Sequence, residues 1–205
     1  MTKQTLQLRR LVTMSMLLAI SIILNIVENY IVVIPIPAAK IGLANIVALI
    51  LLYSYGFKPA FSLTLLRVLL VSLLLPGRFL GPVFWMGLAG AFLAVVTMGL
   101  VKKIKIFGII GTSIFGAIMH TVGQVIVGYF LIGEGLLAYL ALMAFASIIT
   151  GFITGLIARQ FLKVTKDWFQ SKDELKKAQH KNILEELRKT KTSFKKTLAK
   201  VANRK

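Results

Sequence analysis

Polar side chains that could bind a ligand occur inside otherwise apolar segments of this sequence. A charged or amide group within a membrane-spanning segment is costly, by roughly 2.5–3.5 kcal/mol for a central Arg, so each needs a partner or a polar cavity. We therefore treat these residues as candidates for a binding site: Asn25, Glu28, Asn29, Asn45, Arg67, His120 and Gln124.

The depth of these groups follows from the helical rise of about 1.5 Å per residue. Arg67 stands nine positions before Pro76, which places it about 13 Å below the outer loops, near the middle of the membrane. Glu28 is the membrane-embedded acid of the first segment and ends that segment near the outer surface. A separation of about 13 Å in depth is too long for direct pairing, so we expect Arg67 to be the principal anchor of a ligand.

The other candidates are expected at the depth of Arg67 or closer to the outer surface of the membrane. His120 and Gln124 are four positions apart, and therefore lie on one face of a helix. Asn25 accompanies Glu28 at the outer end of the first segment, while Lys40 and Asn45 begin the second.

Two interpretations of this cluster are open. In one, the groups form hydrogen bonds between helices of a static bundle, with Arg67 paired to Glu28. In the other, they line a cavity that is open to the outside and receives a small ligand. The cations Arg67 and Lys40 and a protonatable His120 face a single acid, so an anionic group on the ligand fits this second interpretation.

The segments that carry these groups are those of a membrane protein. Hydrophobic residues make up 57% of the chain and charged residues 16%, with a mean hydropathy of +0.82, whereas soluble domains carry about 25% charge. Breaks at Pro, Gly and Lys divide the apolar part into lengths that suit spanning helices. We predict an all-α integral membrane protein with six transmembrane helices, at about 10–33, 41–56, 59–75, 82–101, 107–132 and 136–161.

Two alternative explanations of the apolar segments fit less well. A β-barrel needs segments of alternating polarity, and a run such as 46–52, Ile-Val-Ala-Leu-Ile-Leu-Leu, does not alternate. A cleavable signal peptide would explain Arg9-Arg10 before an apolar run, but this run exceeds the expected 7–15 residues. We expect the first helix to be a retained span.

Basic residues in the loops predict the orientation, because cytoplasmic loops are enriched in Lys and Arg. With both termini inside, the outer side keeps only Glu28, Lys40, Arg78 and Glu134. The cytoplasmic side receives Lys3, Arg9, Arg10, Lys58, Lys102, Lys103, Lys105 and Arg159.

The last part of the chain differs in composition from the rest. Residues 1–162 hold 11 bases and 2 acids, and residues 163–205 hold 14 bases and 5 acids. Leu184, Leu187, Phe194, Leu198 and Val201 follow a helical spacing within this tail. We therefore predict a membrane domain, 1–162, and a basic amphipathic cytoplasmic tail, 163–205, that binds membrane lipids rather than nucleic acid.

Small residues at helical spacing indicate close helix packing. On the fourth and sixth helices we expect internal contacts through Gly87, Ala91 and Ala94 and through Ser147, Gly151 and Gly155. The link 34–42 contains Pro35 and Pro37 and is either a tight turn or a lid over the cavity.

The sequence lacks the residues of most catalytic and cofactor sites. There is no cysteine, only two histidines, and no GxxxxGK[ST], HExxH or GxSxG motif. Residues 1–162 contain no aspartate, so the Asp-rich clusters that hold magnesium in prenyl diphosphate chemistry are missing. We expect no cofactor, no metal and no enzyme activity.

Three segments resemble a known family. Lys40-Ile-Gly-Leu-Ala-Asn45-Ile-Val-Ala-Leu, Leu65-Leu66-Arg67-Val68-Leu69-Leu70 and the stretch 109–124, which contains His120 and Gln124, look like the bacterial heptaprenyl diphosphate synthase component I proteins, also called the Gx transporter family. The resemblance covers about 10–162.

That family in turn is similar to the substrate-binding S-components of energy-coupling factor transporters, which have six helices, cytoplasmic termini and a pocket near the outer face. The resemblance implies a small-molecule ligand, a transmembrane coupling subunit, two cytoplasmic ATPases and a bacterial cytoplasmic membrane. S-components often dock the coupling subunit through Ala-xxx-Ala on the first helix, which Ser15 and Ala19 match as small-xxx-small. The alternatives are a non-catalytic membrane subunit of a polyprenyl diphosphate synthase and an assembly factor for an envelope redox complex.

Overall fold

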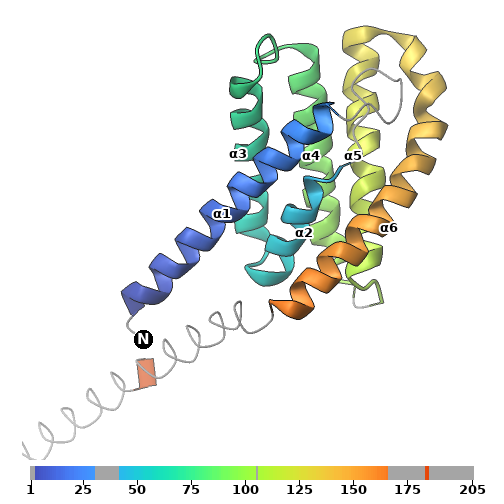
Figure 1. Cartoon of the computed structure of the whole chain (residues 1–205). Coiled ribbons are helices and arrows are strands. Elements are labelled where there is room, and N and C mark those ends of the chain that lie inside the picture. Colours follow the sequence, from blue (N-terminus) through green and yellow to red (C-terminus); the bar gives the residue numbers. More distant parts are fainter. Residues whose placement is uncertain (1–2, 31–41, 105, 166–182, 185–205) are drawn as a thin grey trace, which may run out of the picture. The chain divides into compact units, whose positions relative to one another are not determined.

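The computed structural model of this protein describes residues 3–30, 42–104, 106–165 and 183–184. These residues form helices and no strand. The elements are α1 (Lys3–Tyr30), α2 (Asn45–Ser54), α3 (Phe57–Leu74), α4 (Pro82–Val101), α5 (Ile109–Ile132), the 3₁₀ helix η1 (Glu134–Tyr139) and α6 (Leu140–Val164) (Figure 1). The prediction of an all-helical protein is confirmed.

Residues Arg9–Thr165 form one compact unit. The predicted tail, 163–205, lies almost wholly outside the described residues, and so do Lys40 and most of the link 34–42. The roles predicted for them stay predictions.

Three of the predicted helices, α3, α4 and α5, agree closely with the structure. α4 has the predicted bounds, and α3 and α5 begin within two residues of them. α6 begins at Leu140 rather than at 136, because the chain first makes the 3₁₀ turn η1 after Gly133. α1 begins at Lys3, earlier than the predicted residue 10.

The second helix is shorter than predicted. Gly42 adopts a left-handed φ of +86° and Gly56 a φ of +94°, so both ends of the segment turn sharply. The ten residues of α2 extend about 15 Å, half of the roughly 30 Å of a hydrocarbon core. Nine of them are buried, and α2 packs against α3, α4, α5 and α6.

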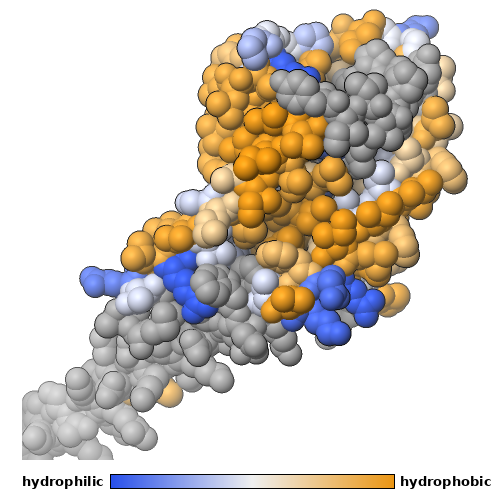
Figure 2. Space-filling view, in the orientation of Figure 1, coloured by the Kyte–Doolittle hydropathy of each residue, from blue (hydrophilic) through white to orange (hydrophobic). Residues whose placement is uncertain are grey.

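Five helices of the described chain are long and apolar enough to cross a membrane: α1, α3, α4, α5 and α6. Large apolar side chains such as Leu73, Phe130 and Phe145 are more than half exposed. Figure 2 shows this hydrophobic surface between hydrophilic ends. The chain is therefore a multi-pass helical membrane protein.

Glycines of α6 bring this helix into close contact with α5. A Cβ atom on Gly151 would lie 2.8 Å from Cα of Ile114, and one on Gly155 would lie 2.9 Å from Cα of Ile110. Side-chain hydrogen bonds also join α5 and α6, between Ser113 and Thr154 at 2.9 Å and between Thr121 and Ser147. The predicted packing stripe of α6, which consists of Ser147, Gly151 and Gly155, is confirmed.

The small residues of α4, which are Gly87, Ala91 and Ala94, do not all make the predicted helix contacts. Ala91 and Ala94 are buried in the bundle, as predicted. Around Gly87 a Cβ atom would meet nothing within 4 Å, and this residue faces a pocket.

Candidate functional site

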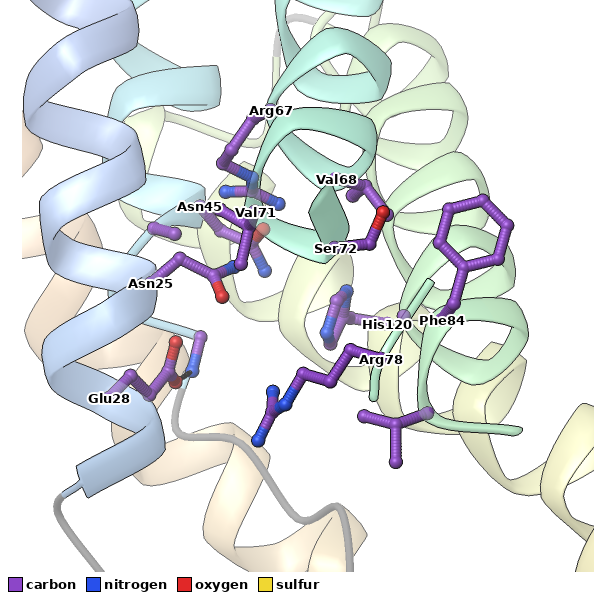
Figure 3. A pocket seen from close by; sticks show the side chains of 14 residues that line it. Asn25, Glu28, Asn45, Arg67, Val68, Val71, Ser72, Arg78, Phe84 and His120 are labelled. Atoms are coloured by element: carbon purple, nitrogen blue, oxygen red, sulfur yellow. Dashed lines mark hydrogen bonds between the residues drawn. The ribbon is translucent and has the colours of Figure 1, made fainter. Parts of the chain in front are cut away.

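The pocket lies at the end of the bundle where α1 and α3 end and α2 and α4 begin. Residues of five helices and of the α3–α4 link contribute to it (Figure 3). The polar residues of the wall are Asn25, Glu28, Asn45, Arg67, Ser72, Arg78 and His120, and the others are Gly42, Ala44, Val68, Val71, Val83, Phe84 and Gly87.

Arg67 is the most deeply buried cation of the pocket, with 2% of its surface exposed. It stands on α3 seven residues before Leu74, or about 10 Å from the end of the helix. Within the described part of the chain its Nε has no hydrogen-bond partner, and Arg67 makes no ion pair there. A guanidinium in this position needs an acceptor to offset the cost of its desolvation.

Glu28 connects the end of α1 to the beginning of α2. Its Oε1 accepts hydrogen bonds from the backbone N–H groups of Gly42 and of Leu43, the second at 3.3 Å. Glu28 as a whole is 5% exposed. Glu28 therefore holds the first turn before α2 in place, and this contact positions Asn45 at the pocket.

Asn45 brings a further donor to the pocket wall. It is the first residue of α2 and is 9% exposed, and its Nδ2 has no hydrogen-bond partner among the described residues. Gly42 approaches this amide closely, since a Cβ on Gly42 would lie 3.3 Å from Nδ2. Figure 3 shows Asn45 beside Arg67 and Asn25.

Arg78 enters the pocket from the link between α3 and α4. The link is a tight turn in which Arg78 N–H donates to the carbonyl of Leu75 at 3.3 Å, and Gly81 N–H donates to that of Arg78 at 3.1 Å. Gly77 and Leu80 both have positive φ, +71° and +58°, and a leucine in this region is strained. Figure 3 shows the Arg78 side chain reaching into the space in front of His120.

Part of the pocket wall is apolar. Val68 and Val71 of α3 and Val83 and Phe84 of α4 line it. The cavity has a volume of about 30 Å³, enough for two or three water molecules. The enclosed space therefore holds one small polar group, and the remainder of a larger ligand would extend beyond it.

The structure brings together five of the residues predicted to bind a ligand: Asn25, Glu28, Asn45, Arg67 and His120. Gln124 is 1% exposed and lies against α4, where a Cβ on Gly90 would be 2.9 Å from its Cγ. Gln124 does not line the pocket. Its predicted role stays a prediction, as does that of Lys40.

The predicted docking residues lie elsewhere on α1. Ser15 and Ala19 are exposed and share a face with the exposed side chains of Leu11 and Ile23. The opposite face of α1, which includes Thr13, Leu17 and Ser21, is buried.

Arg78, Ser72 and the apolar wall were missed by sequence reasoning. The sequence indicates only that Arg78 is a basic residue of an outer loop. Its position between the breaks Pro76-Gly77 and Gly81-Pro82 could have indicated a residue held at the mouth of the helices.

Comparison with known families gives one match. The family model described as heptaprenyl diphosphate synthase component I matches residues 17–161, which is more than half of the chain and includes every residue of the pocket. No curated protein and no solved structure matches. On the strength of that match, the chain belongs to the heptaprenyl diphosphate synthase component I family.

Proposed function

We propose that this protein is the substrate-binding membrane subunit of an ATP-driven transporter of the energy-coupling factor type. In this proposal it binds a small anionic or amphipathic molecule in the pocket around Arg67, and both termini face the cytoplasm of a bacterial cell. It has no catalytic role of its own.

The observation that carries the proposal is the buried guanidinium of Arg67 in a polar pocket inside a membrane protein. A static bundle would pair this cation with an acid, because an unpaired charge in a low-dielectric interior is strongly destabilising. Among the described residues Arg67 forms no salt bridge with Glu28, the acid of the pocket wall, whose carboxylate accepts the backbone N–H groups of Gly42 and Leu43. Intramembrane ionisable groups of this kind mark substrate pathways.

The distribution of charge supports the proposed orientation. Lys58 begins α3, Lys102 and Lys103 follow the α4 end, and Arg159 and Lys163 lie in the last turns of α6. These residues gather at the end of the bundle opposite the pocket. By the positive-inside rule that end faces the cytoplasm, so the pocket faces outward.

The proposed transport step requires partners, because the sequence has no phosphate-binding loop of its own. A transmembrane coupling subunit and two cytoplasmic ATPases would supply the energy. The exposed face of α1 around Ser15 and Ala19 offers small side chains, which permit a partner helix to approach closely.

Purification of the tagged protein from its native membrane in mild detergent tests the proposal. We expect ATPase subunits to copurify, and native mass spectrometry to detect a small molecule on the protein. Replacing Ala19 with Leu should release the ATPases if they dock through this face, whereas the matched change Ala146→Leu on α6 should not.

The same experiment discriminates the two other functions. Recovery of a soluble polyprenyl diphosphate synthase without ATPases would favour the anchoring role that the family description suggests. Recovery of envelope redox subunits alone would favour an assembly factor. Either result would contradict a role in transport.

A further inference from the structure

The polar groups of the pocket are arranged to receive an acceptor. The buried polar atoms of the pocket wall that lack a hydrogen-bond partner in the described chain include Nε of Arg67 and Nδ2 of Asn45, and both of these are donors. The wall carries two guanidinium groups, those of Arg67 and Arg78, and one carboxylate, that of Glu28. The excess of positive charge and of donors favours an anion over a neutral or cationic group.

Arg67 and Arg78 approach this space from different heights. Arg67 comes from within α3, while Arg78 comes from the link that follows α3 and is drawn below Arg67 in Figure 3. The backbone that carries Arg78 is fixed by the N–H hydrogen bonds of Leu75, Arg78 and Gly81 and by the positive φ of Gly77 and Leu80. A group bound between the two would therefore be held on one side by the buried cation Arg67 and on the other by the cation at the mouth, Arg78.

The size and the apolar wall of the pocket restrict the ligand further. About 30 Å³ of space accommodates a group the size of a carboxylate or a phosphate. Val68, Val71, Val83 and Phe84 then border this group on the side of α3 and α4, and apolar surface there gains free energy by covering an apolar part of the ligand.

We propose that Arg67 and Arg78 hold one oxyanion group, a carboxylate or a phosphate, of an otherwise apolar ligand, with Asn45 as a third donor. The apolar part lies along Val68, Val71, Val83 and Phe84. This inference rests on the proposed function only in that the pocket is the ligand site, and it does not depend on the ATPase partners.

Binding of matched amphiphiles tests the proposal. The full-length protein is placed in nanodiscs of phosphatidylcholine and is offered dodecanoate, dodecyl phosphate or dodecanol, and retention is measured by native mass spectrometry and by competition. The three probes share an apolar chain and differ in the head group. We expect at least one anionic probe to bind at least about tenfold more tightly than dodecanol, and the tighter anion identifies the head group as carboxylate or phosphate.

Variants locate the bound anion. Arg78→Gln should remove most of the preference for the anionic probe, and Arg78→Lys should keep part of it, because a lysine retains the charge but not the planar fork. Arg159→Gln, which removes an exposed cation of α6 at the opposite end, should bind like the unmodified protein. Arg78 is only partly buried, so these variants are expected to fold, and size-exclusion profiles check this.

Three outcomes would overturn the inference: equal binding of dodecanol, an unchanged preference in Arg78→Gln, or no retention of either anion. None of them bears on transport, which copurification of ATPases tests separately. Conversely, the anion preference could disappear with Arg78→Gln while no ATPase copurifies with the protein. That result would support the oxyanion site and contradict the role in transport.

Discussion

At the scale of single residues, Arg67 gives a test in which stability and function move in opposite directions. Methionine has a similar length and no charge, so Arg67→Met removes a buried cation that makes no ion pair in the described chain. We expect the ligand-free protein to become more stable, by on the order of 1–3 kcal/mol, and to lose ligand retention. Thermal unfolding in detergent measures this, with Arg159→Met as the exposed control.

The alternative role of Arg67 predicts the opposite sign. If Arg67 were the partner of Glu28 in a static bundle, its removal would leave an uncompensated buried carboxylate and would cost about 3–5 kcal/mol. A large fall in melting temperature for Arg67→Met, with no change for Arg159→Met, would therefore reject the binding role.

Gly90 and Gly87 form a second matched pair at this scale. A Cβ on Gly90 would lie 2.8 Å from the carbonyl oxygen of His120 and 3.0 Å from its Cε1, whereas a Cβ on Gly87 would meet nothing within 4 Å. We expect Gly90→Ala to destabilise the protein by about 1–3 kcal/mol, because α4 and α5 must separate. Gly87→Ala should unfold at or above the temperature of the unmodified protein, and equal melting of the two variants would contradict this packing.

Only part of the site could be predicted from residue types. Asn25, Glu28, Asn45, Arg67 and His120 were identifiable because polar groups in apolar segments are rare and costly. Arg78 was not, because a basic residue in a loop is ordinary until the fold shows that it lines the pocket. The placement of Gln124 against Gly90 depends on how α4 and α5 pack, which a single sequence does not contain.

At the scale of elements, α2 is held by a contact from α4. Lys102 Nζ donates to the carbonyl of Leu52 at 2.5 Å and lies 4.8 Å from the ring centroid of Tyr53. A cation at the end of a helix interacts favourably with the unpaired carbonyls and the helix dipole. We expect Lys102→Met to destabilise the protein by about 1–3 kcal/mol.

Lys103 is the matched control for this prediction, because it is the next residue and is exposed. Lys103→Met should change the melting temperature little, since exposed substitutions usually stay within about 0.5 kcal/mol. If both variants melt like the unmodified protein, the end of α2 does not depend on Lys102.

The bounds of the elements were predictable where the signals were local. Gly81-Pro82 and Lys102-Lys103 delimit α4, because proline fits the first turn of a helix and charged residues leave the hydrocarbon. The bounds of α2 were not predictable to the same degree. Its beginning follows from the turn at Gly42, which the distant carboxylate of Glu28 stabilises, and its apolar sequence extends beyond the helix at both ends.

At the scale of the whole molecule, the distribution of charge predicts which end of the bundle faces the cytoplasm. The chain contains no cysteine, so single cysteines can be introduced without removing others. Lys103 after α4 and Glu134 after α5 are both exposed and lie at opposite ends of α5. A membrane-impermeant maleimide added to intact cells should therefore label Glu134→Cys and not Lys103→Cys.

Permeabilised cells provide the control for accessibility, because both cysteines should then react. Labelling of Lys103→Cys from outside would reverse the orientation and would place the pocket of Arg67 and Arg78 on the cytoplasmic side. The oxyanion site could survive this result, since its donors do not depend on the direction of insertion. The result would contradict uptake from outside, because the ligand would then have to enter the pocket from the cytoplasm. The protein would then have to act in export or as a membrane anchor.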